Sequence, residues 1–217
     1  MPLPPVIANN LSPVGPLPVA PPPPVAPAAP APAALPPPLP PRLPPPALPP
    51  GPPPLSNPLL FMMFHQEQFN WCWAAVALSV ARYYNTTPIW RWQCQIVSAG
   101  LGYVCCPVGQ NANNCDVPWF LDQALGVTNN FRTWAPGAAS IPQIQVEIDG
   151  GQPLGVRIGW SGGGGHFCCV TGYFSVAGAI WVHIEDPCYK QSSLPYSDFC
   201  SQYQTNGTWT DSYWTKP

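Results

Sequence analysis

The fold follows from one stretch, which reads Gln66-Glu67-Gln68-Phe69-Asn70-Trp71-Cys72-Trp73-Ala74-Ala75 and continues as Val76-Ala77-Leu78-Ser79-Val80-Ala81-Arg82-Tyr83-Tyr84. Its second half is rich in alanine and contains neither glycine nor proline. Apolar residues recur there at helical spacing, at Ala77, Val80, Ala81 and Tyr84. Such a pattern predicts a helix with an apolar face that packs against the rest of the domain. We therefore expect a buried central helix that begins at Cys72.

The position of Cys72 at the start of this helix indicates a reactive residue. Unpaired backbone N–H groups and the positive end of the helix dipole lie at a helix N-terminus, and both favour a thiolate over a thiol. The alternative is a small, buried structural cysteine, which is the more common fate of a lone cysteine. A nucleophilic role therefore requires a base elsewhere in the chain.

Of the three histidines, His166 is the candidate base. His65 precedes Cys72 in an irregular segment, and His183 lies in the middle of a strand-like run, where a core or surface role is expected. His166 instead follows four glycines and begins the strand-like run 167–173. Glycines leave room for a substrate backbone to approach the end of a stiff strand.

A predicted hairpin brings a carboxylate to His166. The run 178–186 is also strand-like and ends at Pro187, and a short loop, 175–177, joins it to the preceding strand. If the hairpin is centred on Val176, His166 lies directly opposite Asp186. At that spacing a carboxylate can hydrogen-bond the imidazole and fix its tautomer, although a one-residue slip would remove the pairing.

Cysteine, histidine and aspartate in this order suggest acyl transfer through a thioester. The tetrahedral intermediate also needs hydrogen-bond donors for its oxyanion. The backbone N–H of Cys72 and a side-chain amide just upstream, from Gln66 or Gln68, could supply them.

These residues resemble the papain-like cysteine peptidase superfamily, in which a glutamine lies six residues before a Cys-Trp pair and a histidine and an asparagine or aspartate follow. Gln66 has that spacing and is preferred to Gln68. Within the superfamily, residues 60–190 most resemble the bacterial branch of type III effector proteases and bacteriocin-leader-processing peptidases. The resemblance implies a peptide-bond hydrolase with Cys72 as nucleophile, His166 as base, Asp186 as its orienting group and Gln66 in the oxyanion hole. Its fold would be α+β, with the helix packed on an antiparallel sheet.

Two other functions share parts of this pattern. A transglutaminase-like acyltransferase uses the same order of residues but resolves the thioester with an amine instead of water. A non-catalytic module could bind peptides through the folded domain and dock on a partner through its proline-rich arm.

Residues 1–58 form a proline-rich tail, and residues 59–217 form the predicted peptidase domain. The first 60 residues hold 27 of the 36 prolines and a single charged residue, Arg42, so we expect a disordered polyproline II spacer. Residues 37–42 also match the Pro-x-x-Pro-x-Arg pattern that SH3-like partners accept. The apolar run 59–64 is expected to anchor the tail on the domain, or alternatively to be a site of self-cleavage.

Several further elements complete the α+β order. Residues 88–115 are expected to be loop-rich and to cover the central helix. Short helices are predicted at 117–125 and 142–148, and a strand at 153–160. Helices first and sheet later is typical of α+β domains.

The eight cysteines other than Cys72 predict disulfides, among Cys94, Cys105, Cys106 and Cys115, and between Cys188 and Cys200. Zinc is not expected, because no Cys-x2-Cys pair occurs and histidine is scarce. We therefore predict no metal or other cofactor.

Charge and composition narrow the partners and the compartment. A net charge of −2 with 7% charged residues argues against nucleic acid, while many aromatic residues suit a groove for extended polypeptide. The first residues lack the pattern of a secretory signal, and no run is long enough to span a membrane. Disulfides nevertheless indicate an oxidising compartment, so we expect a monomeric protein exported by a specialised, non-classical route.

Overall fold

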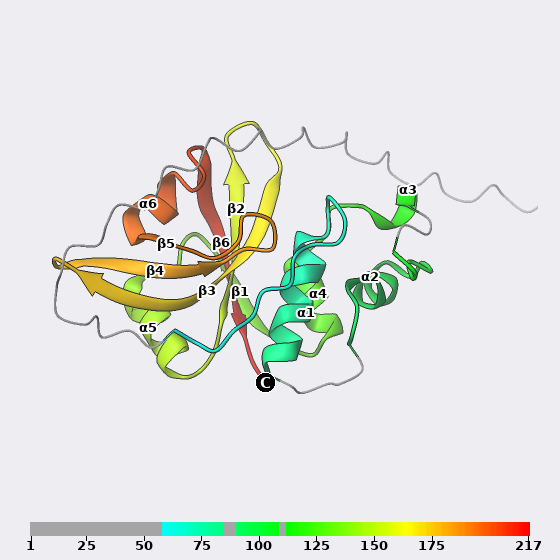
Figure 1. Cartoon of the computed structure of the whole chain (residues 1–217), viewed down its shortest axis with the longest axis horizontal. Helices are drawn as coiled ribbons and strands as arrows, with labels where there is room; N and C mark the ends of the chain where they lie inside the picture. Colours follow the sequence, from blue (N-terminus) through cyan, green and yellow to red (C-terminus); the bar gives the residue numbers. More distant parts are fainter. Residues whose placement is uncertain (1–57, 85–89, 109–111) are drawn as a thin grey trace, which may run out of the picture. The chain divides into compact units, whose positions relative to one another are not determined.

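The computed structural model describes residues 58–84, 90–108 and 112–217, all of which lie in one compact unit. A six-stranded sheet with the order β1-β6-β2-β3-β4-β5 forms its framework, and every neighbouring pair is antiparallel (Figure 1). The strands are β1 (Phe131–Pro136), β2 (Leu154–Trp160), β3 (Gly165–Val176), β4 (Ala179–Glu185), β5 (Ser192–Pro195) and β6 (Gly207–Thr215). The helices are α1 (Cys72–Tyr84), α2 (Gln93–Leu101), α3 (Ala112–Cys115), α4 (Leu121–Val127), α5 (Ile141–Asp149) and α6 (Tyr196–Ser201). The α+β class is confirmed, whereas the tail through residue 57 and its proline motif lie outside the described residues.

The central helix begins at Cys72, as the sequence predicts, and residues 72–81 of α1 are all buried. A helix that is apolar on nearly every side needs cover all round. Helices α2 and α4 and strand β3 contact it and supply that cover. The end of α1 that carries Cys72 is therefore held in a fixed position.

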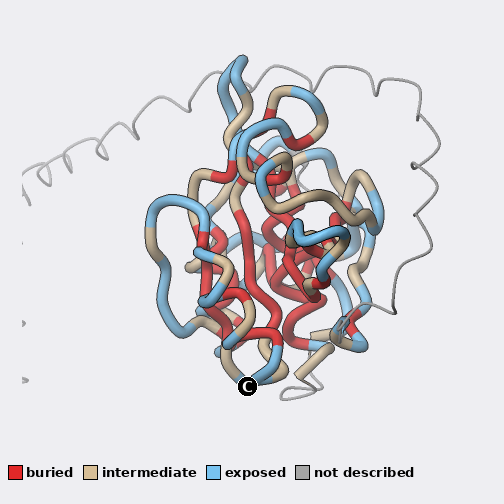
Figure 2. The backbone as a smooth tube through the Cα atoms, turned by 90° about the vertical axis from the view of Figure 1, so that its left-hand side faces the viewer, coloured by how far each residue is buried: buried red, intermediate tan, exposed pale blue. Residues whose placement is uncertain are grey.

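Two apolar cores lie on opposite faces of the sheet, as the alternation along β3 indicates. Phe167 and Cys169 pack in the core that contains α1, α2 and α4, whereas Cys168 and Val170 pack in the core that contains α5 and α6. Figure 2 shows the buried residues gathered inside, with exposed turns around them.

The apolar run before the site anchors the chain on the domain. The N–H of Leu59 donates to Thr171 O at 2.8 Å, and the buried ring of Phe61 lies 5.5 Å from the ring of Tyr83. The N–H of Phe64 donates to the hydroxyl of Ser79 on α1 at 3.0 Å. The run itself therefore packs on the domain, while the tail that it was predicted to anchor lies outside the described residues. In Figure 1 this segment is the cyan stretch of chain that leads to α1.

The predicted hairpin exists, but its predicted register is wrong. The loop has two residues, Ala177 and Gly178, both with positive φ, a conformation that suits the tight turns that close twisted hairpins. A register shift between Val170 and Gly172 then moves the pairing one residue back toward the predicted register, so that Cys169 faces Glu185. His166 is consequently not directly opposite Asp186.

The described parts of the segment 88–115 contain more helix than predicted, because α2 forms within them. The side chain of Gln95 accepts hydrogen bonds from the N–H groups of Arg91 and Trp92 and caps the first turn. Gly102, with φ of 74°, ends the helix in the left-handed conformation that glycine tolerates. The predicted short helices and strand are present as α4, α5 and β2, with ends shifted by a few residues. No helix in the described ranges is long and apolar enough to cross a membrane.

Candidate active site

Cys72 is the first residue of α1 and carries a free thiol. It is buried, with 8% of its surface exposed. The first N–H groups of a helix have no partner within the helix, so they point toward the space beyond its end. The thiol therefore lies next to backbone donors, as the sequence predicts.

His166, the second residue of β3, lies between Cys72 and Asp186. Its Nε2 is 2.8 Å from Oδ2 of Asp186, and its ring is also hydrogen-bonded to Cys72. Because Nε2 faces the carboxylate, the bond with Cys72 is left to Nδ1. The structure thus brings together the three residues that the sequence analysis singled out.

Asp186 follows the last residue of β4 and is buried, with 3% of its surface exposed. Its Oδ1 accepts hydrogen bonds from the N–H groups of Cys188 and Tyr189, both at 2.7 Å. Its Oδ2 accepts from the hydroxyl of Tyr203 at 2.9 Å in addition to His166. Both carboxylate oxygens therefore have two partners, which compensates for the loss of water around a buried charge.

The charges of His166 and Asp186 stabilise each other. Burial lowers the pKa of His166. The Asp186 carboxylate and the hydrogen bond with Cys72 raise this pKa by more than burial lowers it, so the net pKa lies well above 6.5. Burial raises the pKa of Asp186, but His166 and the two backbone N–H groups outweigh this effect, and the net pKa is below 3.8. At neutral pH the site therefore holds an imidazolium between a carboxylate and the Cys72 sulfur.

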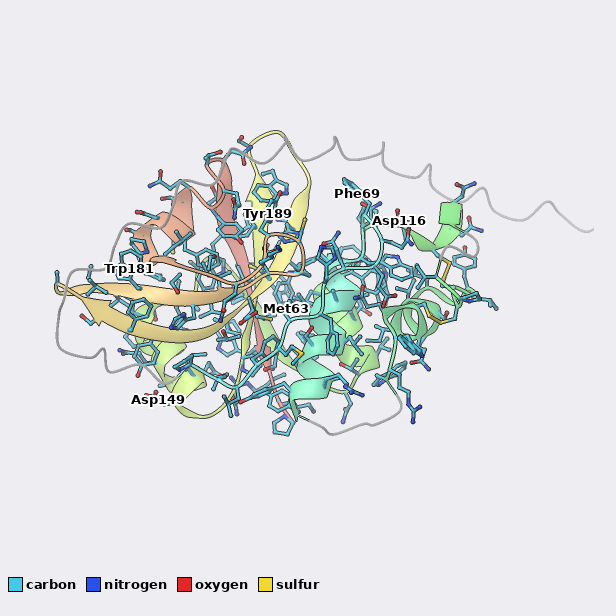
Figure 3. The ribbon with its side chains drawn as sticks, viewed as in Figure 1. Met63, Phe69, Asp116, Asp149, Trp181 and Tyr189 are labelled. Carbon is cyan, nitrogen blue, oxygen red and sulfur yellow. A yellow bond between two sulfur atoms is a disulfide. The ribbon has the colours of Figure 1, made fainter. Side chains whose placement is uncertain are left out.

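Aromatic side chains enclose the imidazole. The ring of Trp160, at the end of β2, stacks on His166 with centroids 6.1 Å apart. Tyr189, labelled in Figure 3, approaches the same ring edge-on at 5.6 Å. Such walls exclude water and strengthen the charge interactions inside.

Gln66 lies in the loop before α1, but its amide is engaged locally. Nε2 donates to the carbonyl oxygens of Gln68 and Phe69 at 3.0 and 2.7 Å. Oε1 is buried and has no hydrogen-bond partner among the described residues. The carbonyl contacts fix the amide orientation, since only an N–H group can donate to them. The backbone of Gln66 also donates to Pro187 O at 3.0 Å, which ties this loop to the residue after Asp186.

The other two histidines do not join the site. His65 is exposed, and its Nδ1 lies 2.8 Å from the carbonyl oxygen of Gln66. Nδ1 of His183 is hydrogen-bonded to the hydroxyl of Ser193, and its ring packs against Phe174. His183 therefore has the structural role that its position in a strand predicts.

The cysteines divide into two bridges and five free thiols. Cys94 is bonded to Cys106 and Cys105 to Cys115, which confirms the expected disulfides of that region. The predicted bridge between Cys188 and Cys200 is wrong, because both residues are free. Cys188 lies in the turn that wraps around Asp186, whereas Cys200 is on α6 and is hydrogen-bonded to Tyr196.

The remaining free thiols are buried and lie within the sheet. Burial raises the pKa of both Cys168 and Cys169, so neither is a reactive thiolate at neutral pH. Within the described ranges, no group of three or more His, Cys, Asp or Glu residues is arranged to hold a metal ion.

Sequence reasoning missed Trp160, Tyr189 and Tyr203. Tyr189 lies only three residues after Asp186 and could have been found as part of the turn that caps the carboxylate. Tyr203 and Trp160 carry no local signal, because the folding of α6 and β2 brings them to the site.

The nucleophile candidate, its neighbouring imidazole and the buried carboxylate form the arrangement of a thiol peptidase on an α+β fold. The chain belongs to the family of the papain-like cysteine protease AvrRpt2, whose model matches residues 57–204. This confirms the papain-like resemblance, and the chain is accordingly a cysteine protease that hydrolyses peptide bonds.

The other comparisons add distant likenesses. A double glycine motif protease from an AMS/PCAT transporter, solved in complex with its leader peptide, is 17% identical over 74% of this chain and 94% of that chain, with a TM-score of 0.41. A structure from work on the mite allergens Blo t 1 and Der p 1 is 12% identical over 76% of this chain and 72% of that chain, with a TM-score of 0.47. No curated protein sequence matches significantly.

Proposed function

We propose that Cys72, His166 and Asp186 are the catalytic triad of this cysteine protease. The observation that carries the proposal is the position of one imidazole, which is hydrogen-bonded both to the thiol at the start of α1 and to a buried carboxylate. These are the contacts that a nucleophile, a general base and an orienting group must make. His183, which lacks such contacts, serves as an internal contrast.

The proposed reaction proceeds through a thioester. The Cys72 sulfur attacks the scissile carbonyl carbon, and His166 Nδ1 donates its proton to the leaving amine as the C–N bond breaks. His166 then takes a proton from water, whose oxygen attacks the thioester and releases the acid and the free thiolate. Asp186 keeps Nε2 protonated throughout, which leaves Nδ1 to exchange protons with the reacting groups.

The oxyanion of the tetrahedral intermediates is proposed to bind at the backbone N–H of Cys72 and the side-chain amide of Gln66. The position of Cys72 in the first turn of α1 and the location of Gln66 in the preceding loop support this assignment. Gln66 Nε2 also donates to two carbonyl groups, so one N–H must turn toward the substrate oxygen as charge develops.

The substrate is a polypeptide, because the family consists of proteases. We further propose that the protein is an exported effector or a self-processing protease that acts as a monomer in an oxidising compartment. Two disulfides within the folded domain support that compartment. The proline-rich tail is proposed to serve as a spacer or as a docking arm for a proline-recognising partner.

The triad predicts the outcome of three substitutions. Cys72→Ala and His166→Ala should each lower kcat/KM at least about 1,000-fold on fluorescent casein and on a proteome-derived peptide library, because each removes a group that bonds to reacting atoms. His183→Ala is the matched control and should keep kcat/KM within about twofold, because its ring bonds to Ser193 away from the site.

Mass spectrometry of the products, with an added primary amine, separates hydrolysis from transfer to an amine. The triad assignment is wrong if either the Cys72 or the His166 variant turns over normally. Amine-modified products in place of new carboxyl termini would instead favour the acyltransferase.

A further inference from the structure

The residues that flank Cys72 are hydrogen-bonded to one short segment, residues 115–117, which begins at the last residue of α3 and leads toward α4. The Asp116 side chain accepts from the N–H of Asn70 at 2.8 Å, and its carbonyl accepts from the Asn70 amide at 3.0 Å. The indole N–H groups of Trp71 and Trp73 donate to the carbonyl oxygens at positions 115 and 117, at 2.7 and 3.0 Å. Four hydrogen bonds therefore fix the chain on both sides of Cys72. Figure 3 labels Asp116 beside Phe69, which lies in the loop that leads into α1.

This segment, which we call the nucleophile clamp, is itself braced by the two disulfides. Cys115 at its start is bonded to Cys105, and the adjacent Cys106 is bonded to Cys94 on α2. Helix α2 also contacts α1 directly. The clamp is thus tied covalently to an element that packs on the helix whose end it positions.

The same helix holds the other end of the loop before Cys72. The buried side chain of Gln93, the first residue of α2, accepts from the N–H of Glu67 at 3.0 Å and donates to His65 O at 2.6 Å. The loop 65–70 is therefore fixed by α2 at one end and by the clamp at the other.

We propose that Asp116 is a positioning residue for Cys72, and that the Cys105–Cys115 bridge holds it in place. This inference rests on the proposed function of Cys72 as the nucleophile. The hydrogen bonds of Asp116 are to Asn70, so it acts through the backbone of Asn70 and the position of the first turn of α1. An attack geometry that changes by about 1 Å can cost about 100-fold in rate.

Asp116 is suited to this task because its side chain accepts from the backbone N–H of Asn70, while its carbonyl accepts from the side-chain amide of Asn70. The side-chain bond requires only an acceptor oxygen, which asparagine also provides. Asp116→Asn is consequently the conservative variant, and Asp116→Ala removes the acceptor.

The experiment compares the disulfide-bonded wild-type protein with Asp116→Ala, Asp116→Asn and the double variant Cys105→Ser with Cys115→Ser. Asp122→Ala on α4, whose carboxylate accepts an exposed hydrogen bond from Gln123, is the matched control. Three quantities are measured: the rate of Cys72 carbamidomethylation by iodoacetamide, followed by peptide mapping; kcat and KM on fluorescent casein; and the melting temperature. The first readout needs no peptidase turnover.

Asp116→Ala and the double cysteine variant should lower the alkylation rate of Cys72 and kcat by about 10- to 100-fold, with KM changed by less than about threefold. Asp116→Asn and Asp122→Ala should stay within about twofold of wild type. A folded Asp116→Ala protein that keeps both rates would overturn the inference, and so would an Asp116→Asn protein as impaired as Asp116→Ala. Turnover that survives in Cys72→Ala would instead overturn the proposed function, and the alkylation rates would still decide the role of Asp116.

Discussion

Asp186 shows how a single residue can fix the chemistry of this site. A buried carboxylate is costly unless every lone pair finds a donor, and here two backbone N–H groups, one imidazole and one phenol supply them. The turn formed by Cys188 and Tyr189 provides the backbone donors immediately after the residue they hold. His166 and Tyr203 reach the carboxylate from other parts of the chain.

Removal of the Tyr203 hydroxyl should leave the Asp186 side chain held less firmly without creating a cavity in the core. Tyr203→Phe keeps the buried ring, which packs edge-on against Phe199, but deletes the bond to Oδ2. We expect kcat to fall about 3- to 10-fold with little change in KM, because an Asp186 side chain with one partner fewer holds the imidazole less firmly.

The control for this variant is Tyr173→Phe, whose hydroxyl bonds to Asp149 on the exposed surface and which should leave kcat unchanged. Steady-state kinetics on fluorescent casein make the comparison. Equal kcat values for the two variants would show that the Tyr203 hydroxyl does not help to position Asp186.

Cys72, His166 and Asp186, the proposed triad, could be singled out from sequence because each has a local signal. Cys72 opens an apolar helix, His166 follows a glycine run, and Asp186 precedes a proline that ends a strand. Asp116 and Tyr203 have no comparable signal, since each reaches its partner only through the tertiary fold.

At the scale of elements, the hairpin of β3 and β4 brings His166 and Asp186 into contact as predicted, but with a different strand register. The two-residue turn and the register shift place Asp186 just beyond the end of the ladder, in line with Cys168 instead of His166. Residues two positions along the neighbouring strand still lie on the same face, and long side chains can meet there diagonally. The pairing inferred from a symmetric loop was therefore wrong, although the contact it suggested exists at 2.8 Å.

The position of β6 was the least predictable feature of the sheet. Strand β6 lies between β1 and β2, which puts the last strand of the chain in the interior of the sheet. Such pairings join residues far apart in sequence and are decided by packing of the whole domain, so local patterns do not reveal them. Helix α1, whose signal is entirely local, was predicted from its first residue onward.

For the whole molecule, charged residues are scarce, so the ion pair of the site should contribute noticeably to how the free energy of unfolding depends on pH. Charged residues make up 7% of the chain, and the His166–Asp186 pair is the most deeply buried ion pair in the described ranges. A group with a perturbed pKa makes stability depend on pH. The site should therefore shape the pH profile of unfolding.

The sign follows from the two pKa shifts. The pKa of Asp186 is lowered, so its contribution is present above about pH 3.8 and is lost as the pH falls through the folded-state value. The pKa of His166 is raised, so its contribution is complete below about pH 6.5 and is lost as the pH rises through the folded-state value. The pair should stabilise the fold most between these limits.

Chemical denaturation checks this in a Cys72→Ala background, which prevents autolysis. The difference in free energy of unfolding between that protein and the same protein with His166→Gln should be largest between about pH 4 and 6.5 and should shrink toward pH 9. A difference that stays constant from pH 4 to 9 would mean that the ion pair does not contribute as described.

The central claim is that Cys72 is the single activated thiol among nine cysteines, and intact-protein mass spectrometry with a thiolate-directed epoxide tests it most directly. The protein is treated without reductant, beside Cys72→Ala, and each sample is then unfolded and alkylated before and after reduction. We predict one epoxide adduct in the wild-type protein and none in Cys72→Ala. Without epoxide, the unfolded wild-type chain should carry five alkylated thiols before reduction and nine after it. An adduct that persists in Cys72→Ala, or no adduct in a folded wild-type protein, would contradict the account.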